Sequence, residues 1–282
     1  IIYLKNKILI FGSTGFIGSE LIHKLNKLDK FEIITPQIID GIEQDILTIK
    51  SASQFYNSNI KYIINLKFYL SGTINSKNNQ LIQSIVNINN NNNCSLIIHF
   101  SSMNIYSQSI TENIINEETL IETRDNYSNS KKLQEDSFLK FKLNNLIILR
   151  LSNIISTKKK NKQNSYFGFI EDMLMTNTNI INIYNNGNQC YDFIDIDYMA
   201  YCLNMIINSN IIGIYNLGSG NVINKIDIIN YLSNDKFTLV NLNKTTPNSY
   251  ILDLTKIKNQ IQLVKFDWKQ SLRKIINKNK SA

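Results

Sequence analysis

The sequence predicts an α/β fold in which a doubly wound parallel sheet precedes a smaller C-terminal region. Apolar runs of strand length alternate along the chain with segments whose apolar residues recur at helical spacing. The first of these runs ends at a glycine-rich turn, and a later one ends in two serines. The chain has 282 residues, a length that can bury a sizeable core and that predicts two lobes.

The glycine-rich turn follows the apolar run over 7–11, and a helix is expected to start directly after it. Gly12 permits the sharp reversal, Gly15 lets backbone N–H groups approach a pyrophosphate, and Gly18 lets the helix pack on the strand. The N-terminus of the helix adds partial positive charge for the phosphates. We therefore expect the turn to hold a dinucleotide through Gly12, Thr14, Gly15, Phe16, Ile17 and Gly18.

A second strand is expected over 31–35, where a chain that binds NAD usually carries Asp or Glu for the ribose 2′-hydroxyl. Thr35, Pro36 and Gln37 stand there instead, and neither Lys nor Arg lies beside them to hold a 2′-phosphate. The sequence therefore leaves the choice between NAD and NADP open.

Further cofactor contacts are expected from the segments that follow. Asp45 and Ile46 are candidates for contact with the adenine, although Asp45 serves equally well as the N-cap of a helix over 46–57. A strand over 61–66 ends at Leu66, another candidate. A helix is then expected over 79–88, and the asparagines at 89–93 are expected to form a surface loop.

A strand of buried type over 95–102 ends in Ser101 and Ser102, and a polar loop is expected over 107–123. Ligands sit at the carboxyl ends of strands in doubly wound sheets, so chemistry is expected at these serines. The next helix, expected from Asp125 to about residue 143, carries Tyr127 and Lys131 on one face. The ammonium group should lower the pKa of the phenol and so suit it to acid–base work on a carbinol or carbonyl. Taken alone, such a pair more often marks the exposed face of an amphipathic helix.

Together, these motifs resemble the extended short-chain dehydrogenase/reductases that act on nucleotide sugars. The matching residues are Gly12-x-x-Gly15-x-x-Gly18, Ser101-Ser102 followed by Ile105-Tyr106, and Tyr127-x-x-x-Lys131. Tyr127 follows Ser102 by 25 positions, a gap similar to that of sugar-nucleotide 4-epimerases. The likeness continues through 149–153, 186–197 and 215–220, to about Trp268. It implies a Rossmann-type domain that binds NAD or NADP over residues 1–155 and a smaller substrate-binding domain over 156–282, from which some chain returns to the first domain.

The resemblance also implies roles for single residues. Tyr127 would be the acid–base residue, Lys131 would hold the nicotinamide ribose and lower the pKa of the tyrosine, and Ser102 would hydrogen-bond the reacting oxygen. Ser101 would be a strand-end residue rather than a second catalytic hydroxyl. The residues expected to touch the nucleotide sugar are Ser102, Asn104, Asn153 and Tyr191.

Departures from the family pattern narrow the chemistry. Met103 and Asn104 stand where 4,6-dehydratases carry an Asp-Glu pair, and neither side chain can remove a proton. Asn104 also replaces the Cys of epimerase-reductases of the GDP-fucose synthase type. Lys67 replaces a small residue near the cofactor, and Tyr191 replaces an Arg that grips the diphosphate. Three functions remain open: a 4-keto reductase, a 4-epimerase and a non-catalytic NAD(P)-binding regulator. The short connection between Thr35 and Asp45 favours the reductase.

Composition and charge exclude several other classes. The net charge of +8 is spread along the chain, and its densest cluster, around Lys158–Lys160, lies in a polar loop, so no nucleic-acid surface is expected. Three cysteines and two distant histidines suggest neither a disulfide framework nor a metal site, and they fit a reducing cytoplasm. No apolar stretch approaches the ~20 residues of a membrane span. A homodimer through the helices at 79–88 and 131–143 is possible, although packing on the sheet explains their apolar faces equally well.

Overall fold

The structure, a computed structural model, describes residues 5–70, 74–107, 114–156, 180–183, 190–221, 223–233, 238–241 and 250–280. Its centre is a six-stranded sheet in the order β13-β8-β6-β5-β1-β2, and every neighbouring pair of strands is parallel. The strands are β1 (Asn6–Phe11), β2 (Phe31–Ile34), β5 (Ile60–Asn65), β6 (Leu96–Ser102), β8 (Leu146–Leu151) and β13 (Gly213–Leu217). The doubly wound parallel sheet predicted from the sequence is confirmed.

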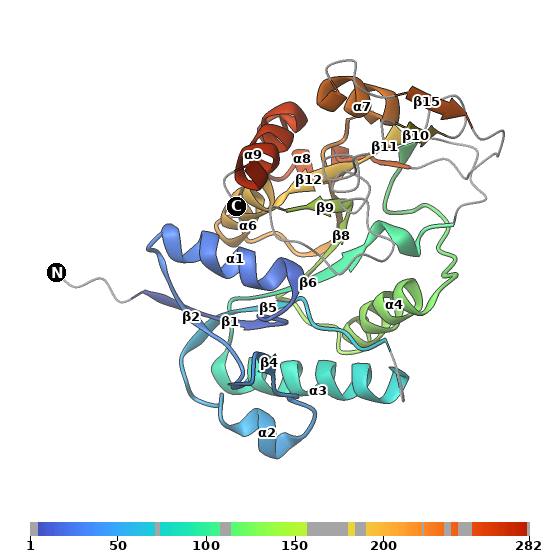
Figure 1. Cartoon of the computed structure of the whole chain (residues 1–282). Helices are drawn as coiled ribbons and strands as arrows, with labels where there is room; N and C mark the ends of the chain where they lie inside the picture. The colour runs from blue at the N-terminus through green and yellow to red at the C-terminus, as the bar shows by residue number, and fades with distance from the viewer. Residues whose placement is uncertain are drawn as a thin grey trace.

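Helices cover both faces of this sheet (Figure 1). On one face lie α1 (Phe16–Lys27) and α6 (Ile196–Ile207), and on the other lie α2 (Ile49–Ser53), α3 (Ile74–Asn92) and α4 (Asn126–Leu139). Burial on both faces explains why the strands are almost continuously apolar. In β1, the side chains of Ile8 and Ile10 join the core under α1, whereas those of Leu9 and Phe11 join the core under α3.

The remaining elements are short and lie mainly beyond β8 in the chain. The small strands of the described ranges form two-stranded pairs, namely β3 with β4, β9 with β12, β10 with β15, β11 with β14 and β7 with β16. Their bounds are β3 (Ile38–Ile39), β4 (Ile42–Glu43), β7 (Ile114–Ile115), β9 (Asn153–Ile155), β10 (Ile180–Ile183), β11 (Cys190–Tyr191), β12 (Phe193–Asp195), β14 (Ile223–Asn224), β15 (Thr238–Asn241) and β16 (Ile251–Leu252). The other helices are η1 (Met103–Ile105), α7 (Lys225–Ser233), α8 (Thr255–Lys258) and α9 (Trp268–Lys280).

One buried residue, Asp192, joins three of the later segments. Asp192 accepts hydrogen bonds from the backbone N–H groups of Ser219, at 2.7 Å, and Leu252, at 3.0 Å. Its main-chain oxygen accepts a hydrogen bond from the amide of Asn153, which lies at the start of β9. These contacts fix the chain beside the ends of β8 and β13, where Asn153 leaves the sheet. Within the described ranges, no helix is both long enough and apolar enough to cross a membrane.

Three local expectations were wrong. Residues 89–92 are helical rather than looped, because α3 continues to Asn92, whose amide donates to the carbonyl oxygens of Phe55 and Ile88, both at 2.9 Å. The helix expected over 46–57 is the five-residue α2, and Thr48, not Asp45, is its N-cap. The loop expected over 107–123 contains β7, which pairs with β16.

Candidate active site

A cavity of about 540 Å³ opens at the carboxyl ends of the central strands. The first glycine follows β1, Leu66 follows β5, and Ser101 and Ser102 end β6. The helices α1 and α4 contribute further parts of the wall, as do the residues that follow β8. Its lining residues are Gly12, Gly15, Phe16, Ile17, Gly18, Leu66, Phe68, Phe100, Ser101, Ser102, Met103, Asn104, Asp125, Tyr127, Lys131, Leu151, Ser152, Asn153 and Ile154.

The glycine turn has room for backbone alone. Gly12 has φ +85, and a Cβ there would lie 2.9 Å from the carbonyl carbon of Leu66. A Cβ on Gly18 would collide with the carbonyl oxygen of Gly12, which also accepts a 3.1 Å hydrogen bond from the N–H of Gly15. Gly15 is the N-cap of α1 and has no side chain that could cover the N-terminus of that helix. The turn therefore fits the pyrophosphate of a dinucleotide, as the sequence predicts.

At the other end of the cavity, α4 presents Tyr127 and Lys131. Asp125 caps this helix by accepting a 2.7 Å hydrogen bond from the N–H of Ser128, and the hydroxyl of Ser128 bonds back to Asp125. The cap fixes the first turn, which carries Tyr127, so that the phenol and the amine four positions on both line the cavity.

Lys131 is a buried amine, with 3% of its surface exposed. Its Nζ donates to the carbonyl oxygen of Phe100 at 2.8 Å and lies 4.2 Å from the ring centroid of Phe68. Glu135, one turn further on, forms two hydrogen bonds to Arg150 at 2.9 and 3.1 Å. Burial lowers the pKa of Lys131 to about 7, against a weaker opposing effect of Glu135.

Ser102 and Tyr127 meet across the cavity. Burial raises the pKa of Tyr127, while a hydrogen bond with the side chain of Ser102 opposes that rise and the charge of Asp125 adds to it. The lowering expected from Lys131 is therefore wrong for this structure, because desolvation of the phenol outweighs the hydrogen bond with Ser102. A phenol in this setting stays protonated at neutral pH and can donate a proton.

The other predicted residues divide into three groups. Asn104, Asn153 and Leu66 line the cavity. Thr14 is exposed outside its wall, and Ile46 is buried in the core under α3. Tyr191 belongs to β11, but its side chain lies outside the described residues, as do Lys158–Lys160. The contacts of all these residues with a ligand remain predictions.

Sequence reasoning missed Ser152 and Phe68, and it treated Ser101 only as a strand-end residue, yet all three line the cavity. The hydroxyls of Ser101 and Ser152 are buried without a hydrogen-bond partner among the described residues. Ser152 directly follows β8, so its position after a central strand could have identified it. Phe68, whose ring packs edge-on against Tyr127 at 5.3 Å between centroids, follows β5 by three positions and left no such signal.

A second cluster lies beside the glycine turn and consists of Glu43, Asp45, Lys67 and Tyr69. The Nζ of Lys67 lies 3.0 Å from Asp45 Oδ1 and 3.4 Å from Glu43 Oε1. The hydroxyl of Tyr69 donates to Asp45 at 2.6 Å. Lys67 therefore does not project into the cavity as a free cation, although it replaces a small residue of the family pattern.

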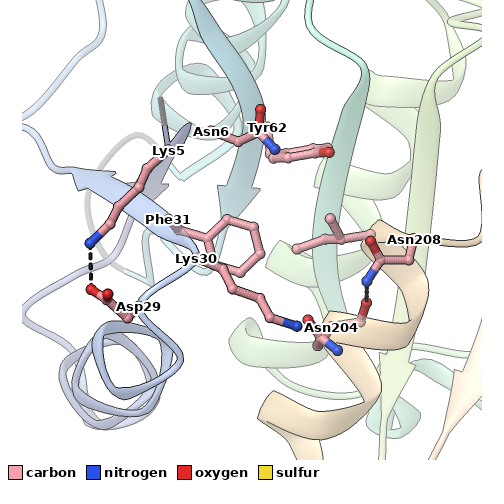
Figure 2. A pocket seen from close by; sticks show the side chains of 9 residues that line it. Lys5, Asn6, Asp29, Lys30, Phe31, Tyr62, Asn204 and Asn208 are labelled. Atoms are coloured by element: carbon pink, nitrogen blue, oxygen red, sulfur yellow. Dashed lines mark hydrogen bonds and ion pairs between the residues drawn. The ribbon is translucent and has the colours of Figure 1, made fainter. Parts of the chain in front are cut away.

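Another hollow, of about 490 Å³, lies at the opposite ends of the strands from the first cavity (Figure 2). Phe31 and Tyr62 form its apolar side, with Lys5 paired to Asp29 at its rim. It lies at the amino ends of β1, β2 and β5, where a doubly wound sheet does not bind its ligand. We therefore do not assign this hollow as a second active site, although its volume is similar to that of the first cavity.

The parallel sheet, the glycine turn and the Tyr127–Lys131 pair define an extended short-chain dehydrogenase/reductase. The model of the NAD dependent epimerase/dehydratase family matches residues 8–218, and the chain belongs to this family. Family membership implies NAD or NADP as the cofactor, and the glycine turn fits either one. The resemblance and the fold class predicted from the sequence are thus confirmed.

Solved structures share the fold over nearly the whole chain. The UDP-Glc/GlcNAc 4-epimerase from Campylobacter jejuni has a TM-score of 0.79 and 17% identity, with 98% of this chain and 100% of that chain covered. The dTDP-glucose 4,6-dehydratase from Bacillus anthracis, in complex with NAD, has a TM-score of 0.79 and 16% identity, with 98% and 97% covered. RMD from Pseudomonas aeruginosa, complexed with NADPH, has a TM-score of 0.78 and 16% identity, with 99% and 100% covered. No curated protein sequence matches the chain significantly.

Proposed function

We propose that the protein is an NAD(P)-dependent oxidoreductase that reduces the 4-keto group of a nucleotide-activated sugar. The observation that carries this proposal is the convergence of Ser102, Tyr127 and Lys131 on one cavity whose far end is the glycine turn. A hydroxyl, a phenol and an amine in this arrangement suit reduction of a carbonyl next to a nicotinamide.

Each of the three side chains has a separate part in the proposed reaction. When bound, the nicotinamide supplies the hydride. Tyr127 donates the proton to the ketone oxygen, and its raised pKa keeps that proton available at neutral pH. Ser102 hydrogen-bonds the same oxygen and holds it near the phenol. Lys131 binds ribose hydroxyls from its buried position beside Phe100.

Asn104 and Asn153 are proposed to hold the sugar. Both line the cavity on the side away from the glycine turn, at the ends of β6 and β8. Met103 and Asn104 offer no acid or base next to Ser102, which argues against dehydration. The short connection between Thr35 and Asp45, folded as the hairpin of β3 and β4, resembles that of the reductase members.

A nucleotide-sugar 4-epimerase is the second candidate, favoured by the 25-position gap between Ser102 and Tyr127. Tyr127 would then first accept the proton of the C4 hydroxyl and later return it to the C4 oxygen, with Ser102 and Lys131 in the same roles, and the nicotinamide, when bound, would take and return the hydride. A non-catalytic regulator is a third candidate, but one that gives no role to the retained Tyr127 and Lys131.

The test is an assay with a nucleotide 4-keto-6-deoxysugar and either NADH or NADPH. A reductase consumes reduced nicotinamide in step with the sugar, which is followed by the absorbance of the cofactor. Interconversion of C4 epimers of UDP-glucose without net consumption would replace the reductase by the epimerase. Absence of both reactions across a panel of nucleotide sugars, with dinucleotide binding intact, would support the regulator.

A further inference from the structure

Glu43 brings a carboxylate to the glycine turn from outside the central sheet. Its side chain is buried, and the residue is 5% exposed. Both of its carboxylate oxygens accept a hydrogen bond from the N–H of Gly12, at 2.9 and 3.0 Å. The N–H and the hydroxyl of Ser13 donate to Oε2 at 2.6 and 2.5 Å. One acid thus bonds the first two residues of the turn proposed to hold the dinucleotide.

A tight hairpin sets the position of this acid. Strands β3 and β4 pair antiparallel, with Ile39 opposite Ile42 and Ile38 opposite Glu43. Asp40 and Gly41 link them with φ values of 50 and 75, the positive values that a two-residue hairpin turn requires. The hairpin folds the chain back after β2, so the acid reaches Gly12 although 31 positions separate the two residues.

The acid supplies what the end of β2 lacks. An NAD-binding unit usually carries its ribose acid at that end, and this chain has Thr35 there. The carboxylate of Glu43 lies against the same turn but arrives from β4. A carboxylate can accept hydrogen bonds from ribose hydroxyls, and it repels a 2′-phosphate.

The charges around Glu43 also favour an unphosphorylated ribose over a 2′-phosphate. Lys67 is engaged by the carboxylates of both Glu43 and Asp45, so these three groups sum to one negative charge. Lys77 is another cation nearby, and its Nζ lies 5.3 Å from the centroid of the Tyr69 ring. The cation beside Glu43 is therefore already paired, whereas a 2′-phosphate site needs one that is available.

We propose that Glu43 is the residue that selects NAD over NADP, by recognising the unphosphorylated ribose of the adenosine half. The inference rests on the dinucleotide binding of the proposed function, but not on the sugar or on the direction of the reaction. It gives Glu43 the role that the acid at the end of β2 usually has in an NAD-binding unit and that no residue at that end can fill in this chain.

The experiment is a fluorescence titration of the whole protein with NADH and with NADPH, without any sugar. The native protein should bind NADH about 10- to 100-fold more tightly, the range expected for a charge-assisted hydrogen bond. Glu43→Gln keeps the size of the side chain and removes the charge, so it should weaken NADH, leave NADPH unchanged or tighter, and abolish the preference. Glu32→Gln on β2, an exposed acid near Lys7, is the matched control and should keep the preference.

Two results would overturn the proposal. One is equal affinity of the native protein for NADH and NADPH. The other is a Glu43→Gln variant that loses the same factor for both, which would make Glu43 only a brace for the turn. If that variant does not fold, as judged by its thermal transition, competition on the native protein decides: ADP should displace NADH far better than adenosine 2′,5′-bisphosphate does, and equal displacement refutes the proposal. Failure to bind either dinucleotide would remove the cofactor function itself, whereas a missing reductase activity would leave this inference standing.

Discussion

Lys67 and Lys131 are two lysines near one site with opposite surroundings. Lys67 lies within ion-pair distance of Glu43 and Asp45, beside the glycine turn. Lys131 lies at the other end of the cavity, where its amine has a carbonyl oxygen and the face of Phe68 as neighbours. In the described part of the chain, no carboxylate lies within ion-pair distance of Lys131.

From this difference we propose that Lys67 stabilises the structure and that Lys131 takes part in the chemistry. Two carboxylates hold the first amine as a fixed charge. Burial without a carboxylate partner brings the pKa of Lys131 to about 7, because Glu135 is engaged by Arg150 instead. A buried amine that changes charge near neutral pH belongs at a functional site, whereas a paired one belongs to the scaffold.

The largest expected effect comes from removing the unpaired amine. Lys131→Met should lower turnover of a nucleotide 4-keto sugar about 10²- to 10⁴-fold, since the variant loses the group next to the proton donor. Steady-state kinetics with saturating NADH measure the effect. Lys132→Met is the matched control, because Lys132 pairs with Asp136 on the same helix and does not line the cavity. A Lys131→Met variant with native turnover would show that the amine takes no part.

The paired amine should matter for stability instead. Lys67→Met leaves Glu43 and Asp45 without their cation and should lower the free energy of unfolding by about 1–3 kcal/mol, a range reduced because Asp45 is partly exposed. Urea denaturation at pH 6 checks this. Lys131→Met should raise the free energy of unfolding under the same conditions, because it removes a buried charge. An equal decrease in the free energy of unfolding in Lys67→Met and Lys131→Met would contradict the proposed difference between the two lysines.

A smaller effect is the pH dependence of stability. The pKa of Lys131 is about 7 in the folded protein and 10.5 as the ordinary value, so the unfolded chain binds more protons between these limits. The contribution of Lys131 to the free energy of unfolding should therefore rise from pH 7 upwards, by at most about 1.4 kcal/mol per pH unit. Urea titrations at pH 7 and about pH 8.5 should show this rise in the native protein relative to Lys131→Met. Parallel pH profiles of the two proteins would contradict the lowered pKa.

Much of this architecture could be predicted from the sequence, because local patterns carry it. The apolar run that ends at Gly12 and the three glycines predict the strand, the turn and the following helix. The four-residue spacing of Tyr127 and Lys131 placed both on one helix face, and both line the cavity.

What could not be predicted depends on contacts distant in the sequence. Glu43 reaches Gly12 only because a two-residue turn folds β3 onto β4, and no residue near Gly12 in the sequence indicates this contact. The helical state of residues 89–92 depends on Asn92 bonding Phe55, which belongs to a different segment. The raised pKa of Tyr127 reflects how deeply the packed fold buries the phenol, and spacing along one helix contains no such information.

The most direct test of the proposed chemistry is the turnover of Tyr127→Phe measured together with its affinity for NADH. The substitution removes one hydroxyl and leaves the ring that packs against Phe68. We predict a fall in kcat of about 10²- to 10⁴-fold, with the dissociation constant for NADH unchanged within about twofold. Native turnover in Tyr127→Phe, with NADH bound as before, would contradict the assignment of the proton donor and with it the proposed reaction.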